Sequence, residues 1–151
     1  MESNGYQQYR EQSIFGLSAN ELLLLLFDEL IKRLGRCELA LTQKNYELLD
    51  ESADRCLAII RYLDDTLNHN YAISAELHRL YGYFYYELNR VKVGRNKGEL
   101  DKIKPMLTDL RDTFRQAAQN CASGNGGEID APPVAPAVHQ QAAHAESSAQ
   151  E

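Results

Sequence analysis

The chain has 151 residues, a net charge of −6 and 25% charged residues, which fits one soluble domain and argues against non-specific nucleic-acid binding. Its longest apolar run, from Leu22 to Phe27, is far shorter than the roughly 20 residues that span a bilayer, so we expect no membrane insertion. The N-terminus has no basic region followed by an apolar one, and we therefore expect no signal peptide.

Residues 1–17 are polar, with apolar side chains that are too sparse for a core helix. Tyr6, Tyr9 and Ile14 are points at which this segment could lie on a neighbouring surface. We expect an N-terminal strap or short helix, and a loose tail is the alternative.

The first long helix is predicted over residues 19–41. Ser18 and Glu21 have the spacing of a capping box, in which each side chain accepts a hydrogen bond from the other residue's backbone N–H. The run from Leu22 to Phe27 is apolar on every side, although one buried stripe needs an apolar residue only at every third or fourth position. Two surfaces must therefore cover this helix: the core, and either the N-terminal segment or a partner. The expected core stripe is Leu23, Leu26, Leu30, Leu34, Cys37 and Leu41.

Three further helices are predicted over residues 46–67, 74–93 and 98–121, because apolar residues recur there in steps of three and four. Ser74 is the expected N-cap of the second of these, and residues 68–70 are expected to close the helix before it. Pro105 falls inside the last pattern, where it either kinks the helix or begins it near residue 104. Residues 122–151 are rich in Gly, Pro, Ala and Gln and are predicted to be disordered.

These segments predict an all-α fold, an antiparallel four-helix bundle with short connections. The expected divisions are a strap over residues 1–17, a bundle over 18–121 and a disordered tail over 122–151.

The helices carry more apolar residues than a four-helix bundle needs. A second partial stripe runs along the first three helices, and its members are Leu24, Leu25, Ile31, Leu57, Tyr62, Tyr83 and Tyr86. Exposed contiguous apolar area usually marks a partner site, and a groove between helices suits an amphipathic helix. The alternatives are internal packing and a homodimer.

No catalytic, cofactor or metal motif with specific spacing is present in the sequence. His69 and His78 are not joined by a cysteine at ligand spacing, and no Glu-x-x-His motif of a di-metal bundle occurs. The basic run from Arg90 to Lys104 is typical of helix-end charge matching, with RNA binding as the alternative. We therefore expect no enzyme, no cofactor and no nucleic-acid partner.

Three widely spaced cysteines, Cys37, Cys56 and Cys121, make a disulfide framework improbable and fit a reducing cytoplasm. All three are expected to line the core as small residues.

Four motifs, taken in order, resemble the FliS family of flagellin export chaperones. Tyr6 and Tyr9 precede Ser13-Ile14 and the cap Ser18-Ala-Asn-Glu21-Leu22, which leads into Leu26-Phe27-Asp28. Residues 59–68 are similar to the end of the family's second long helix. Residues 80–88 are similar to its third-helix signature, and residues 107–114 to the end of its last helix. The family's Pro-Gly in the cap is Ala19-Asn20 here, and its final tryptophan is Phe114.

The resemblance implies a cytoplasmic helical bundle that binds the C-terminal segment of newly made flagellin. Binding would hold flagellin unpolymerised until the flagellar type III export apparatus takes it, and components of that apparatus are further expected partners. Tyr6, Tyr9 and Ile14 would then form the strap over the binding groove. The residues expected to line or support the groove are Leu22, Leu25, Leu57, Tyr62, Tyr81 and Tyr83. The alternative is a non-catalytic helical oligomer or adaptor that self-associates through the same surface.

Overall fold

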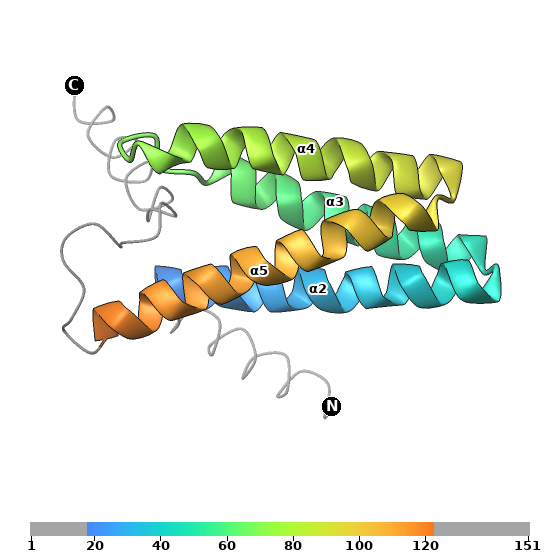
Figure 1. Cartoon of the computed structure of the whole chain (residues 1–151), viewed down its shortest axis with the longest axis horizontal. Coiled ribbons are helices and arrows are strands. Elements are labelled where there is room, and N and C mark those ends of the chain that lie inside the picture. Colours follow the sequence, from blue (N-terminus) through green and yellow to red (C-terminus); the bar gives the residue numbers. More distant parts are fainter. Residues whose placement is uncertain (1–17, 123–151) are drawn as a thin grey trace, which may run out of the picture.

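The computed structural model of the protein describes residues 18–122, which form four helices and, within that range, no β-strand (Figure 1). The helices, labelled as in Figure 1, are α2 (Ala19–Gln43), α3 (Tyr46–Asp65), α4 (Ile73–Gly94) and α5 (Lys97–Ala122). The predicted all-α four-helix bundle is confirmed. The predicted strap and all but the first residue of the predicted tail lie outside the described residues.

The four helices close into a ring in which each packs against two others. The packed pairs are α2 with α3, α3 with α4, α2 with α5, and α4 with α5. Figure 1 shows α5 starting beside the end of α4 and crossing to the first half of α2, so that its last turns lie away from α4. Among the described residues, three ion pairs join α5 to α2. Arg111 and Arg115 each contact Asp28, at 3.3 and 3.2 Å, and Lys104 contacts Glu38 at 2.6 Å.

Local hydrogen bonds explain where the first two helices begin. The Ser18 hydroxyl accepts from the Glu21 N–H at 3.2 Å, and the Ser18 N–H donates to the Glu21 carboxylate at 2.8 Å, so the capping box is confirmed. Asn45 caps α3 by accepting from the Leu48 N–H at 3.1 Å. Lys44 and Arg95, just after α2 and α4, have left-handed backbones with φ of 55° and 52°. They turn the chain between antiparallel neighbours.

Two predicted helix boundaries are wrong. Ser74 does not cap α4: the helix starts after Ala72 without a side-chain cap, and the Ser74 hydroxyl donates to the Asn68 carbonyl. The preceding helix ends at Asp65, and no residue from 68 to 70 has the left-handed backbone that was expected to close it. Ser74 instead fixes the connection onto the start of α4, which explains why this hydroxyl is buried.

The core stripe of α2 is rotated from the predicted one. Phe27 and Ala40 are fully buried, whereas Leu26 and Leu41 are only partly buried and pack at the edge of the core. The Phe27 ring lies 5.5 Å from the Phe114 ring of α5, measured between centroids. This pair therefore joins the two helices that the sequence places farthest apart.

Two smaller expectations are settled by α5. The helix continues through Pro105 from Lys97, so the alternative start near residue 104 is wrong. Cys121 is exposed, which contradicts its expected place in the core, while Cys37 and Cys56 are buried as predicted. Cys121 lies in the last turns of α5, where that helix has separated from α4.

Two carboxyl groups are buried together where α4 meets the start of α5. Glu87 and Glu99 share a hydrogen bond. Arg90 lies 3.4 Å from each of them, and Lys102 lies 3.4 Å from Glu99. The hydrogen bond to Glu99, burial and the Glu99 charge raise the pKa of Glu87. The hydrogen bond from Glu87 and the charges of Arg90 and Lys102 lower the pKa of Glu99. As the pH rises, Glu99 therefore loses its proton before Glu87 does.

Replacing Glu87 by glutamine is expected to raise the melting temperature, and to raise it more at pH 8 than at pH 5. A raised pKa stabilises the fold at low pH, and that contribution is lost as the pH rises through the folded-state pKa. Glutamine donates the same hydrogen bond to Glu99 at every pH. Thermal melts of both proteins across this range test the prediction. Glu76→Gln, an exposed change on the same helix, is the control, and an equal pH trend in both variants would contradict the assignment.

Candidate functional site

Exposed apolar side chains lie on the outer surface of α2 and α3. Leu25 is 46% exposed and Tyr62 is 41% exposed, and Leu22 is half-buried one turn before Leu25. Leu25 lies 18 residues before the end of α2, and Tyr62 lies 16 residues after the start of α3. At about 1.5 Å per residue these two positions reach nearly the same height on antiparallel helices. The structure thus brings three of the predicted residues to one end of the α2–α3 pair. We call Leu22, Leu25 and Tyr62 the α2–α3 face.

Two other predicted residues are part of the core. Leu57 is 8% exposed and Tyr81 is 1% exposed, and both belong to the buried cluster of the bundle. They can support a binding surface from below but offer little area to a partner.

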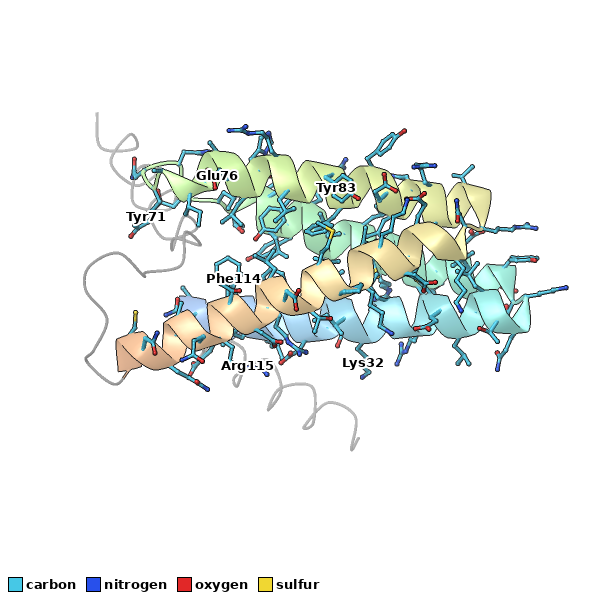
Figure 2. All side chains as sticks on the ribbon, viewed as in Figure 1. Lys32, Tyr71, Glu76, Tyr83, Phe114 and Arg115 are labelled. Atoms are coloured by element: carbon cyan, nitrogen blue, oxygen red, sulfur yellow. The ribbon has the colours of Figure 1, made fainter. Side chains whose placement is uncertain are left out.

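Tyr83 belongs to a different part of the surface from Leu25 and Tyr62. It is 39% exposed on α4, and its ring lies 5.8 Å from that of Phe84 in the core. Figure 2 shows Tyr83 near the middle of α4, and Phe114 between α5 and the α3–α4 pair. The predicted set therefore divides between the α2–α3 face, α4 and the core, while Tyr6, Tyr9 and Ile14 lie outside the described residues.

Several exposed apolar residues were not predicted as site residues. They are Leu39, Tyr71, Ile73, Tyr86, Val93 and Met106. Tyr86 was recognised as surplus to the core but was not assigned to the groove. Tyr71 and Ile73 flank the exposed Ala72 at the start of α4, and Val93 lines a hollow with Tyr86, whereas Leu39 and Met106 lie on α2 and α5. Scattered exposed apolar residues are normal on proteins. Their spacing in the sequence carries no signal that separates them from core positions.

A polar pocket of about 480 Å³ opens between α3 and α4. It is lined by Ile60, Arg61, Asp64, Asp65, Tyr81, Gly82 and Tyr85. The Arg61 guanidinium lies 5.2 Å from the centre of the Tyr85 ring and donates to the Tyr85 hydroxyl at 3.1 Å. His78 contacts the Asp64 carboxylate at 2.6 Å. This pocket combines charged and aromatic groups, whereas Leu22, Leu25 and Tyr62 carry no charge.

The site offers binding surfaces and, among the residues described, no grouping for metal chemistry. Within residues 18–122, no three His, Cys, Asp or Glu side chains are placed so that they could hold a metal ion. None of the four described helices is long and apolar enough to cross a membrane. What the arrangement can do is bind another polypeptide through apolar and aromatic side chains on a preformed helical scaffold.

Comparison with known proteins identifies relatives of this chain. Residues 2–121 match the family model described as "Flagellar protein FliS". The "Flagellar secretion chaperone FliS" of Bacillus subtilis (strain 168) is 29% identical over 117 residues, which cover 78% of this chain and 88% of that relative. The family match spans the whole bundle and most of the segment before it.

Proposed function

The chain belongs to the FliS family of flagellar proteins, and from this membership we propose that it is an export chaperone that binds the C-terminal segment of newly made flagellin. In this proposal, binding takes place in the cytoplasm and keeps flagellin unpolymerised. The flagellar type III export apparatus then receives flagellin from the complex. The protein acts by binding and catalyses no reaction.

The observation that carries the proposal is the family match together with the α2–α3 face, in which Leu25 and Tyr62 are exposed and Leu22 is half-buried. An amphipathic segment of flagellin would lay its apolar side on this face. Tyrosine suits such a contact because its ring is apolar and its hydroxyl remains solvated at the rim. Tyr83 on α4 would extend the contact if the bound segment continues around the bundle.

Reversible binding follows from the state of the partner. A segment that is disordered before binding loses conformational freedom when it is ordered on the chaperone. That ordering offsets part of the energy gained from burying apolar area, so a large contact gives only moderate affinity. A carrier that must release its cargo to an export apparatus needs this balance.

Titration calorimetry of the full chain against the C-terminal segment of the host's flagellin tests the proposal. We expect saturable binding at about one to one, with a negative heat-capacity change from apolar burial. An N-terminal flagellin segment of equal length is the control. Absence of binding at high micromolar concentration would refute the proposal. If light scattering then showed a mass that rises with concentration, the apolar face would belong to self-association instead.

A further inference from the structure

The pocket between α3 and α4 contains a buried hydroxyl group that has no partner. Tyr81 is 1% exposed, and its hydroxyl has no hydrogen-bond partner within the described part of the chain. Leaving a buried polar group unsatisfied destabilises a folded protein. Burial and the nearby charge of Asp64 raise the pKa of Tyr81, which moves it further from neutral pH. A hydrogen-bonding group from outside the bundle would satisfy it.

The same pocket holds two carboxylates at the C-terminal end of α3. Asp64 and Asp65 are the last two residues of this helix, and its last turn contains no basic residue. The end of a helix carries partial negative charge, so acidic side chains there are unfavourable unless a cation neutralises them. Asp64 contacts His78, whereas Asp65 forms no ion pair with any described residue. A positively charged group bound at this end of the pocket would therefore be stabilised by the charge of Asp65.

Arg61, the cationic residue that lines the pocket, is bound to Tyr85 on α4. Arg61 lies over the Tyr85 ring and donates to the Tyr85 hydroxyl. It forms no ion pair with Asp64 or Asp65 among the ion pairs of residues 18–122. Of the two carboxylates, Asp65 thus has no ion-pair partner within residues 18–122, while Arg61 and Tyr85 hold each other in place.

Gly82 lines the pocket between α3 and α4. It lies in the middle of α4, and a Cβ atom added there would meet no other atom within 4 Å. The packing of the bundle therefore does not require glycine at this position, and glycine in a helix is destabilising relative to alanine. A larger side chain at this position would therefore point into open space beside the pocket that Gly82 lines.

We propose that the pocket between α3 and α4 binds a single lysine or arginine side chain of the polypeptide that the protein carries. The aliphatic stem passes over Gly82, and the cationic head lies between Asp64 and Asp65. One N–H of that head donates to the Tyr81 hydroxyl oxygen. This inference rests on the proposed function, because the cation belongs to the bound flagellin segment. It adds a charged contact to the apolar contacts of the α2–α3 face.

Asp65→Asn tests the charge directly. Titrated with the same flagellin segment, this variant is expected to bind about tenfold more weakly, because a close charge pair is lost. Asp50→Asn removes the same charge from an exposed position near the start of α3, and its affinity is expected to change less than twofold at the same salt concentration. Equal affinities for both variants and the unaltered protein would overturn the inference and leave the proposed function intact. Absence of binding by the unaltered protein would refute the proposed function.

Gly82→Leu tests the open mouth of the pocket. The variant is expected to bind the flagellin segment about tenfold more weakly, because the added side chain occupies the approach over α4. Gly35→Leu is a matched control on α2, where an added Cβ likewise meets no atom within 4 Å. If both leucine variants bind like the unaltered protein, no chain crosses Gly82 and the inference is wrong.

A small probe tests the pocket without flagellin. Butylguanidinium carries the proposed head and stem, and butylurea is its neutral counterpart of similar shape. In NMR titrations of the full chain, only butylguanidinium is expected to shift the Gly82 amide resonance saturably, and Asp65→Asn should abolish that shift. Tyr81→Phe should weaken the shift while melting no lower than the unaltered protein, because it removes a hydroxyl without a partner. Equal responses to both probes, or to butylguanidinium with and without Asp65, would overturn the inference.

Discussion

Replacing Phe27 by alanine is expected to remove about 3–5 kcal/mol from the free energy of unfolding. Phe27 is fully buried, and its ring packs on Phe114, the side chain that holds the second half of α5 against α2. Deleting the ring leaves a void between two helices that no other aromatic contact joins within residues 18–122. A loss of this size is a large part of the 5–15 kcal/mol that usually holds a domain together. Urea unfolding followed by circular dichroism measures it.

Leu25→Ala is the matched control for this change. It lies two residues from Phe27 on the same helix but is half exposed, so its loss should stay within about 1 kcal/mol. Phe27→Leu leaves a smaller void and should fall between the two, which keeps the comparison usable if the alanine variant does not fold. A Phe27→Ala protein as stable as Leu25→Ala would mean that the α2–α5 contact contributes little.

Replacing both Leu25 and Tyr62 by aspartate is expected to weaken flagellin binding by about 100-fold or more while the bundle stays folded. Both side chains are exposed in the free protein, so charges there are solvated and change stability little. In a complex the same charges must leave water against an apolar segment, which is strongly unfavourable. Titration calorimetry with the flagellin segment gives the affinity, and circular dichroism gives the fold.

The control for this double variant is Leu39→Asp with Tyr86→Asp. Leu39 is 50% exposed at the far end of α2, and Tyr86 is 62% exposed on α4. The control thus introduces the same residue types and the same charge away from the α2–α3 face. If both double variants bind equally well, the site lies elsewhere on the bundle; if both fail equally, the effect comes from charge and not from position.

The number, order and approximate ends of the helices could be predicted because they follow local rules. Ser18 with Glu21 is recognisable at the start of α2, and steps of three and four mark the buried side of α3, α4 and α5. On α2 the spacing identified Leu23, Leu30 and Leu34 as buried, but it did not decide between Leu26 and Phe27, because residues 22–27 are all apolar. Phe27 packs against Phe114 of the distant helix α5, a contact that no spacing within α2 reveals.

The candidate site was harder to predict than the fold for a related reason. A surplus apolar stripe shows that some side chains lie off the core, but it does not show which neighbouring helix covers them. Leu57 is covered and Tyr62 is open, although both were members of the same second stripe. The pocket between α3 and α4 is lined by Asp65 and Gly82, which come from different helices. No spacing within one helix could reveal that pairing.

The short connections between the helices affect the folding rate of the bundle. Only Lys44 and Asn45 join α2 to α3, and only Arg95 and Asn96 join α4 to α5, so each pair can form as a local hairpin. Helical proteins with mainly local contacts fold within microseconds to milliseconds. The closing of α5 onto α2 is the one packing step between helices far apart in the chain, and we expect it to come after the transition state. Removing Phe27 should therefore accelerate unfolding and leave the refolding rate nearly unchanged in stopped-flow measurements.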